Sequence, residues 1–291
     1  MSDARTSTEH MGGRWHGRYG TAPCPVCQPE GRKGQGALTL GDGRGGLLAH
    51  CKKSHCDFRA ILEAAGIMPG EYRAPDPSVI AQREVERRAK AEKRAQQAFG
   101  IWWGAQPIEG TAAETYLRGR GITCPLPDTL RFLPECWHGA TARRHSAMVA
   151  RIDGAEGFAV HRTYLRPDGK GKADLEPAKA MLGAVTGGAV RLSEGPGSLV
   201  VSEGLETALS LASGLLRAPV TTWAALSASG MAGLRLPRDL GRLTIAPDGD
   251  APGRKAAHDL AERAHALGWQ VSMLDPGDGL DWNDRLRGWA A

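Results

Sequence analysis

Two short stretches decide the fold: residues 199–209, with the sequence LVVSEGLETAL, and residues 243–250, with the sequence LTIAPDGD. Each begins as an apolar run that is typical of a buried strand and stops at acidic residues and glycine. After each, apolar residues recur at helical spacing, in the second case over residues 253–267. Two strand–helix units in succession predict a parallel α/β sheet, and such sheets bind ligands at the carboxyl ends of their strands.

The acidic residues of these stretches are expected to meet at one edge of that sheet. Glu203 follows the first strand, and Asp248 and Asp250 follow the second. Three neighbouring carboxylates ionise together only with a cation among them, and carboxylate oxygens are the ligands that Mg²⁺ prefers. The sequence therefore predicts a divalent metal site at this edge.

This order of motifs, a lone glutamate after one apolar strand and Asp-x-Asp after a later one, resembles the Toprim domain of bacterial-type primases, topoisomerases and some nucleases. The resemblance implies a Rossmann-like catalytic domain over residues 196–291, in which Glu203, Asp248 and Asp250 hold Mg²⁺, or Mn²⁺. Toprim domains often carry a further acid after a later strand. Asp281 is the preferred candidate for it; Asp284 is the other, unless it caps a short helix at 285–290.

Residues 1–70 carry a second metal-site pattern. A Cys-x-x-Cys pair is followed, after a glycine-rich stretch of 23 residues, by a second pair with four residues between its cysteines. Two such pairs joined by a hairpin are the layout of a zinc ribbon, because Zn²⁺ takes four tetrahedral sulfur or nitrogen ligands. The expected ligands are Cys24, Cys27, Cys51 and Cys56. The wide second spacing leaves His50 or His55 as a replacement for one cysteine.

This segment also resembles the zinc-binding domain at the N-terminus of bacterial and phage primases, through residues 15–20 (WHGRYG) with Cys24-Pro25 and residues 56–62 (CDFRAIL). It departs from that family at Cys27, where a histidine is more usual. The resemblance implies that the module helps to read single-stranded template DNA. The side chains that would stack on bases or hold phosphates are Trp15, Arg18, Tyr19, Lys52 and Lys53. The alternative is that Trp15 packs on the ribbon and the cations are solvated.

Residues 71–98 are predicted to form a basic helical linker, since residues 79–98 consist largely of good helix formers and have a thin apolar face. A new packed unit is expected to begin at residue 99. Within residues 99–195 the pattern predicts a short helix at 111–122, a strand at 130–134, and a hairpin of 148–152 and 157–165 around Asp153-Gly154.

The order of these middle elements resembles the subdomain that precedes Toprim in primase catalytic cores. There, basic residues line a groove for template and initiating nucleotides. The residues carried over as groove candidates are Arg151, His161, Arg162, Lys170, Lys172 and Lys179. Among them Lys179 is singled out, with a surface lysine on a loop as the alternative. Cys124 and Cys136 have no partner pair and are interpreted as ordinary reduced cysteines.

Length and composition limit the number of domains and the classes of function that are possible. A chain of 291 residues accommodates about two domains with real cores. The net charge of +5 permits nucleic-acid binding. No apolar run approaches the ~20 residues of a membrane span. The N-terminal residues lack a signal peptide's apolar core, and the cysteines have ligand-like spacing, so a reducing cytoplasm is expected.

Taken together, a zinc ribbon, a basic middle region and a Toprim-like region predict a DNA primase of a phage, plasmid or mobile element. It would build RNA primers on single-stranded DNA from ribonucleoside triphosphates, with Mg²⁺ lowering the pKa of the attacking hydroxyl and Glu203 serving as ligand or general base. No P-loop pattern is present, so a separate replicative helicase is the expected partner. The alternatives are a Toprim nuclease and a non-catalytic single-strand-binding adaptor.

Overall fold

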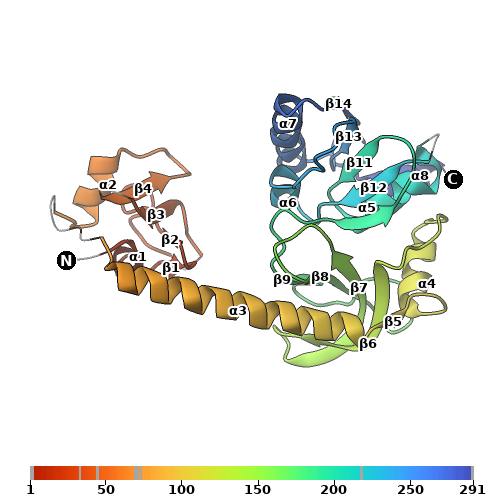
Figure 1. The fold of residues 1–291 in the computed structure, drawn as a ribbon, viewed down its shortest axis with the longest axis horizontal. Coiled ribbons are helices and arrows are strands. Elements are labelled where there is room, and N and C mark those ends of the chain that lie inside the picture. The colour runs from red at the N-terminus through yellow and green to blue at the C-terminus, as the bar shows by residue number, and fades with distance from the viewer. Residues whose placement is uncertain are drawn as a thin grey trace. The chain divides into compact units, whose positions relative to one another are not determined.

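The computed structural model describes residues 3–32, 34–43, 46–68, 72, 74–216 and 219–289. The chain divides into two compact units, Met1–Lys90 and Ala91–Ala291 (Figure 1). Helix α3 (Pro77–Trp103) contains the boundary between them. None of the helices in the described ranges is both long and apolar enough to cross a membrane.

The first unit is built on a four-stranded antiparallel sheet in the order β1-β2-β3-β4. The strands are β1 (Arg14–Trp15), β2 (Tyr19–Ala22), β3 (Leu38–Asp42) and β4 (Leu47–Cys51), and the helices are α1 (Ala4–His10) and α2 (Phe58–Ala64). Leu38, Leu40 and Ile61 fill its core together with Cys24 and Cys51. So small an apolar core usually needs a metal or disulfides to hold the fold.

Helix α3 is longer than predicted. The sequence placed its end at residue 98 and a new packed unit at 99, but the helix continues to Trp103. Ala98 and Trp102 are its buried residues, and both pack against Val149 and Val160 of the antiparallel sheet. This tertiary burial stabilises the last turns of the helix despite the low helix propensity of Gly100.

The N-terminal half of α3 carries internal ion pairs. Glu84 lies 2.6 Å from an Arg87 guanidinium nitrogen and 3.0 Å from that of Arg88. Exposed pairs of this kind add little to stability. Arg87 and Arg88 are thus paired with an acid of their own helix.

In the second unit, residues after α3 form a five-stranded antiparallel sheet in the order β5-β6-β7-β8-β9. Its elements are β5 (Gln106–Pro107), α4 (Ala112–Gly119), β6 (Leu130–His138), β7 (Arg143–Ile152), β8 (Ala159–Tyr164) and β9 (Lys179–Gly183). The predicted antiparallel pairing of 148–152 with 157–165 is confirmed, with Ala150 opposite His161. Strands β6 and β7 extend beyond their predicted bounds because they pair with each other as far as His138 and Arg143.

The C-terminal sheet has the order β10-β12-β11-β13-β14, and all its neighbours except the edge strand β10 are parallel. The strands are β10 (Val190–Ser193), β11 (Leu199–Ser202), β12 (Thr221–Ala224), β13 (Arg242–Ala246) and β14 (Gln270–Met273). The predicted parallel sheet is therefore confirmed, with β11 and β13, the strands of the two deciding stretches, side by side at its centre.

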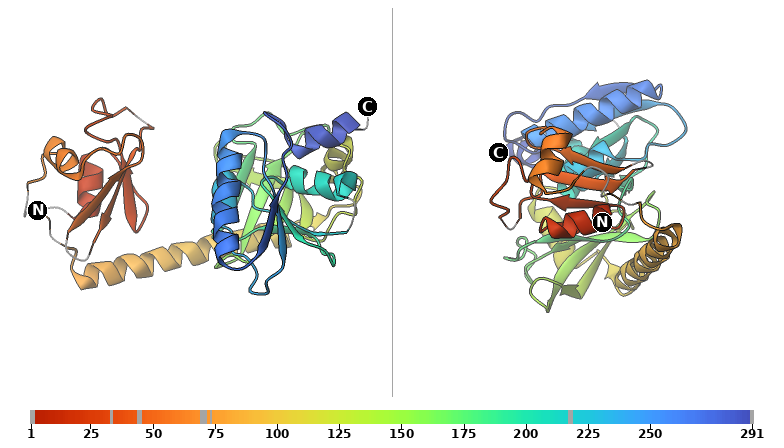
Figure 2. Two further views of the ribbon diagram at one scale, coloured as in Figure 1. Left: turned by 90° about the horizontal axis from the view of Figure 1, so that it is seen from above. Right: turned by 90° about the vertical axis from the view of Figure 1, so that its left-hand side faces the viewer.

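Helices cover both faces of this sheet (Figure 2). One face carries α6 (Ala228–Ala232) and α7 (Ala251–Ala266), whose apolar residues pack on Val201 and Ile245. The other carries α5 (Leu205–Ser210), continued by one turn of π-helix to Leu215, and α8 (Trp282–Trp289). Ser227 caps the N-terminus of α6.

A single apolar core joins the two sheets of the second unit. Met148 and Ala150 of β7 pack in it with Leu192 of β10 and with Leu205 and Leu209 of α5. All five side chains are at most 3 % exposed. Because packing at this density resists local displacement, side chains contributed by the two sheets keep fixed positions toward one another.

Candidate metal centres and nucleotide site

Four cysteine sulfurs of the first unit lie together. The Sγ atoms of Cys24, Cys27, Cys51 and Cys56 are all within 4.8 Å of one another, and those of Cys27 and Cys51 are 3.6 Å apart. Sulfur ligands ~2.3 Å from a tetrahedral Zn²⁺ are about 3.8 Å apart. The spacing therefore fits a zinc ion and is far too long for a disulfide bond.

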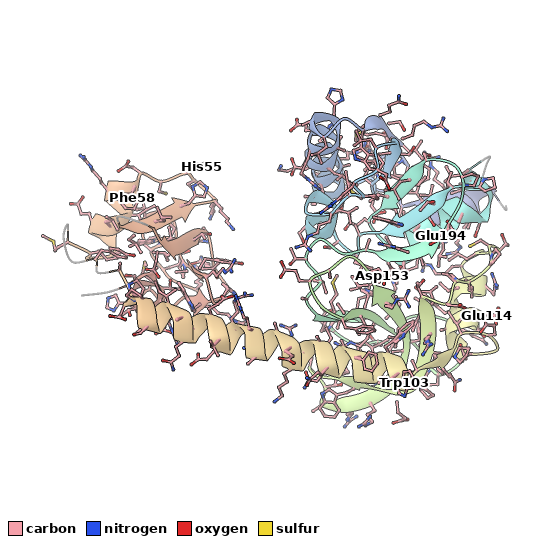
Figure 3. The ribbon with its side chains drawn as sticks, in the orientation of Figure 1. His55, Phe58, Trp103, Glu114, Asp153 and Glu194 are labelled. Atoms are coloured by element: carbon pink, nitrogen blue, oxygen red, sulfur yellow. The ribbon has the colours of Figure 1, made fainter. Side chains whose placement is uncertain are left out.

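Backbone amides favour a thiolate within this group. Burial raises the pKa of the Cys51 thiol, but amides of Ser54, Cys56 and Lys53 outweigh burial and lower it to about 6. Neither His50 nor His55 joins the cluster of ligand atoms among the described residues. Their rings lie 5.7 Å apart, and His55 is exposed at the surface (Figure 3). The four-cysteine set is thus the one that the structure assembles.

Of the residues proposed to contact DNA in this unit, Trp15 is half-buried and packs against the ribbon core. Tyr19 is 44 % exposed and stacks on His16 with ring centroids 5.0 Å apart. Lys52 and Lys53 are exposed beside the cysteine cluster. The packing alternative thus applies to Trp15, and the side chains of Arg18, Tyr19, Lys52 and Lys53 are accessible.

Three acidic residues of the second unit, Glu203, Asp248 and Asp250, gather at the carboxyl ends of β11 and β13, which we call the carboxylate edge. A methyl group built on Gly253 would lie 2.9 Å from Oδ1 of Asp250 and 3.2 Å from Oε2 of Glu203. Its backbone amide donates to Asp250 Oδ1 at 2.7 Å, which makes Asp250 the N-cap of α7. A glycine at this position allows the helix N-terminus to approach both carboxylates.

The charges of these acids oppose one another. Burial raises the pKa of Glu203, and the neighbouring Asp248 and Asp250 raise it further. Burial likewise raises the pKa of Asp248, against a hydrogen bond from Thr207, with Asp281 and Asp250 adding to the rise. Clusters of carboxylates with raised pKa values bind divalent cations, which remove the repulsion.

Within the described residues, no three of these carboxylates have oxygens all within 4.8 Å of one another, a spacing reached by the cysteines alone. Asp248 and Asp250 each use one oxygen in a hydrogen bond within the protein. A carboxylate has two oxygens, so both residues fit a hydrated Mg²⁺, which commonly takes one or two carboxylates and several waters.

Asp281 lies near this cluster and caps the last helix. Its Oδ1 accepts from the Asp284 amide at 2.8 Å, and Asp284 Oδ2 accepts from the Asp281 amide at 3.1 Å. This reciprocal pair is a capping box, in which Asp281 precedes the first residue of α8, Trp282. The alternative that Asp284 caps a helix starting at residue 285 is therefore wrong, because the helix begins three residues earlier.

Two residues of α5 that the sequence analysis passed over belong to this region. The Thr207 hydroxyl donates to Asp248 Oδ1 at 3.1 Å. Glu206 is 4 % exposed and lies 3.1 Å, through Oε2, from Nζ of Lys179 and 3.5 Å, through Oε1, from Nζ of Lys172. The signal available in the sequence was a second acid, two residues after Gly204, within the apolar helical pattern that follows the strand. An acid at a buried helix position is nearly always paired.

Lys179 is the cation that borders both groups of acids. Besides its bond to Glu206, its charge lowers the pKa of Glu203 and of Asp248 against the effects that raise them. The side chains of Lys172 and Lys179 are 35 % and 40 % exposed. A lysine pair next to a carboxylate edge has the charges needed for a phosphate–metal complex.

His161 is buried on the same face as the lysines. Its ring is 3 % exposed, and Nδ1 has no hydrogen-bond partner among the described residues. Burial lowers the pKa of His161 to about 4, and Lys179, Arg162 and Lys172 act in the same direction against Glu206. The imidazole is therefore neutral at physiological pH and is no phosphate-binding cation.

The structure does not bring the remaining groove candidates to this place. Arg151 and Arg162 lie on the opposite face of the antiparallel sheet. Arg151 bonds Asp153 at 3.0 Å, and Arg162 donates to the carbonyl of Trp137 at 3.1 Å. Lys170 is exposed on the loop between β8 and β9. Only His161, Lys172 and Lys179 share the surroundings of Glu206.

A polar groove of about 680 Å³ adjoins Lys172. Arg144, His145 and Ser146 of β7 line it together with Arg166 and Lys172. None of the four acids described above is among its lining residues. Two other acids, Glu135 and Asp174, line the groove beside these cations, and the groove is separate from the carboxylate edge.

Two known domain families match the second unit, one in each half. Residues 198–289 match the Toprim domain, which confirms the resemblance drawn from the two acidic motifs. Residues 92–192 match a domain of unknown function (DUF7146). The comparison with curated proteins gave no match.

Several solved primase structures are similar to this chain. The zinc-binding and RNA polymerase domains of Aquifex aeolicus primase share 14 % identity over 99 % of this chain and 83 % of that one, with a TM-score of 0.44. A DNA primase domain from Pseudomonas aeruginosa shares 19 % identity over 67 % of this chain and 74 % of its own, with a TM-score of 0.41. The RNA polymerase domain of Mycobacterium tuberculosis primase shares 18 % identity over 69 % of this chain and 82 % of its own, with a TM-score of 0.41. At such values these similarities establish nothing about the chemistry of this chain.

Proposed function

We propose that this chain, whose residues 198–289 form a Toprim domain, is a DNA primase that joins ribonucleotides on a single-stranded DNA template with the help of Mg²⁺. The observation that carries the proposal is the position of Lys179, whose charge acts on Glu203 and Asp248 while its ammonium group bonds Glu206. Nucleotidyl transfer requires cations on the triphosphate beside carboxylates for the metal.

Each group of residues at the site has a proposed role. Glu203, Asp248, Asp250 and Asp281 are the acids proposed to hold Mg²⁺, which when bound lowers the pKa of the attacking 3′-hydroxyl and neutralises charge on the leaving pyrophosphate. Thr207 fixes one oxygen of Asp248. Lys172 and Lys179 bind the triphosphate and offset its charge at the edge of the site.

Template binding is proposed for two surfaces. In the first unit, the zinc-bound ribbon presents Tyr19, Lys52 and Lys53, an aromatic ring and two cations of the kind that bind single strands. In the second, the groove lined by Arg144 and Arg166 accepts phosphates. The net charge of +5 is consistent with a polyanionic partner.

A priming assay tests the proposal directly. The zinc-loaded full chain is incubated with single-stranded DNA of varied sequence, labelled ribonucleoside triphosphates and Mg²⁺, and the products are separated by size. We expect short RNA products that disappear in the Asp248→Asn/Asp250→Asn double variant. Lys255→Met is the matched control, because Lys255 pairs with Asp259 on the exposed face of α7.

Two other results would each contradict the proposal and support a different function. Shortened DNA without RNA synthesis would identify a nuclease that uses the same carboxylates. Neither RNA nor cleavage, with single-strand binding unchanged in the double variant, would identify a non-catalytic adaptor.

A further inference from the structure

One buried carboxylate links three elements of the second unit. Oε1 of Glu206, on α5, accepts a hydrogen bond of 2.8 Å from the hydroxyl of Tyr116, on α4. The same oxygen lies 3.5 Å from Nζ of Lys172, on the loop before β9, and Oε2 lies 3.1 Å from Nζ of Lys179, in β9. The helix, the loop and the strand therefore meet at a single side chain.

This arrangement sets Glu206 apart from the acids of the carboxylate edge. Its side chain is only 6 % exposed, and both oxygens are already occupied by donors from the protein. Burial raises the pKa of Glu206, but Lys179 and Lys172 outweigh burial and hold it well below its usual range. Glu206 thus stays ionised without a metal and faces the lysines.

The lysines depend on this anion for their spacing. Two ammonium groups that approach the same region repel each other, and each sits on a flexible four-carbon stem. Bonding to opposite oxygens of one carboxylate holds them in place and offsets the repulsion. His161, neutral in the same surroundings, adds no third positive charge beside the two lysines.

We propose that Glu206 is a positioning residue that fixes the ammonium groups of Lys172 and Lys179 at the separation needed to receive two oxygens of a nucleotide's triphosphate. The inference rests on the proposed function for the identity of the phosphate compound. Tyr116, which is 3 % exposed, supports it, since its hydroxyl donates to Oε1 of Glu206 and so helps to fix the carboxylate. Glu206 itself touches neither metal nor substrate.

The test measures phosphate binding apart from catalysis. Binding of inorganic tripolyphosphate to the zinc-loaded full chain is followed by calorimetry in excess Mg²⁺, below the melting temperature of every variant. We expect Glu206→Gln, which keeps the shape but removes the charge, to weaken binding about tenfold or more. Glu156→Gln is the matched control, because Glu156 is exposed and pairs with Arg235; its affinity stays unchanged.

A double-variant cycle shows whether Glu206 acts through the lysines. Lys172→Met weakens tripolyphosphate binding in the wild-type background, and we expect a much smaller further loss in the Glu206→Gln background. In the priming assay Glu206→Gln raises KM for the ribonucleotide more than it lowers kcat. A residue that merely supported the fold would lower the melting temperature and leave this coupling at zero.

Three results would overturn the inference: no tripolyphosphate binding by the wild type, affinity of folded Glu206→Gln within twofold of the wild type, or fully additive effects in the cycle. Should Glu206→Gln not fold, Tyr116→Phe replaces it, and an unchanged affinity in that variant counts against the proposal. If the wild type binds tripolyphosphate in a Glu206-dependent way but makes no primers, the primase proposal fails and the positioning role of Glu206 remains.

Discussion

The hydroxyl of Thr207 donates to Oδ1 of Asp248 at 3.1 Å, across 41 residues of sequence, and so connects the first turn of α5 to the end of β13. This bond orients one oxygen of a carboxylate proposed to bind Mg²⁺ and leaves the other oxygen for the ion. Residues that orient metal ligands in this way commonly affect metal affinity about 10–100-fold.

Replacing Thr207 by Val removes the donor and keeps the shape of the side chain. We expect the Mg²⁺ concentration for half-maximal priming to rise about tenfold, because Asp248 loses its fixed orientation. Thr207→Ser retains the hydroxyl and is the matched control, with a Mg²⁺ requirement close to that of the wild type. An unchanged requirement in Thr207→Val would show that this bond has no role in the metal site.

The raised pKa values of Glu203 and Asp248 predict that metal-free protein is least stable when both are ionised. A carboxyl whose pKa is raised by folding binds its proton more tightly in the folded state, so stability falls as pH rises through the folded pKa. In Mg²⁺-free buffer at pH 7, Glu203→Gln should therefore raise the melting temperature by about 2–4 °C.

Addition of Mg²⁺ reverses the order of the two proteins in this experiment. The ion stabilises the wild type by binding to its folded state, and it stabilises Glu203→Gln less. Thermal melts with and without Mg²⁺ measure both effects, and Glu156→Gln serves as control. A lower melting temperature for metal-free Glu203→Gln would contradict the repulsion that the geometry implies.

Much of this site follows from the sequence, because an apolar strand that stops at an acid in a parallel sheet can only place that acid at the sheet's carboxyl edge. Glu203, Asp248 and Asp250 were found by this rule. The pairing of Glu206 with Tyr116, Lys172 and Lys179 was not, since these residues are 27 or more residues away along the chain and are brought to Glu206 by tertiary packing.

One error was avoidable from the sequence. His161 and Arg162 were assigned to the same groove although they are neighbours on one predicted strand. Successive side chains of a strand point to opposite faces, so at most one of them can face the groove. The extension of α3 through Gly100 was not foreseeable from propensity, because it depends on burial of Trp102 against another element.

Buried His161 gives the protein a second pH dependence. Folding lowers its pKa from 6.5 to about 4, so the unfolded chain binds a proton in this window and the folded chain does not. Stability is therefore lost as the pH falls from about 6.5 toward 4, by at most about 3 kcal/mol. Burial is the largest cause of this lowered pKa; the charges of Lys179, Arg162 and Lys172 add to it, and that of Glu206 opposes it.

Denaturant melts at pH 7 and pH 5 measure this dependence. We expect the loss of unfolding free energy between the two pH values to be clearly smaller in His161→Gln than in the wild type. His258→Gln is the matched control, because His258 is exposed on α7 and its removal should leave the difference as it is. Equal losses in His161→Gln and the wild type would show that His161 is accessible to protons in the folded state.

Zinc removal should unfold the first unit selectively. Its apolar core is small and includes the buried cysteines Cys24 and Cys51, so folding free energy must come largely from the metal. We expect Cys51→Ser to lower the zinc content and to expose the first unit to proteolysis, while residues 91–291 resist cleavage. Cys124→Ser, in the second unit, keeps the zinc content of the wild type. Full protection of residues 1–90 in Cys51→Ser would contradict a structural role of the metal.

Gly253 should be indispensable for the carboxylate edge for a reason unrelated to helix stability. A Cβ at this position would lie 2.9 Å from Oδ1 of Asp250 and from the carbonyl of Asp248, and 3.2 Å from Oε2 of Glu203. We therefore expect Gly253→Ala to displace these carboxylates and to lower priming activity more than tenfold, although alanine is the better helix former.

The matched control for Gly253→Ala is Gly100→Ala in α3, where a Cβ meets no atom within 4 Å. That variant should be more stable by about 0.5–1 kcal/mol and fully active, since it gains helix propensity without a clash. Activity and denaturant melts of both variants separate the two effects. If Gly253→Ala matched Gly100→Ala in both measurements, close approach of the α7 N-terminus to Glu203 and Asp250 would have no part in the chemistry.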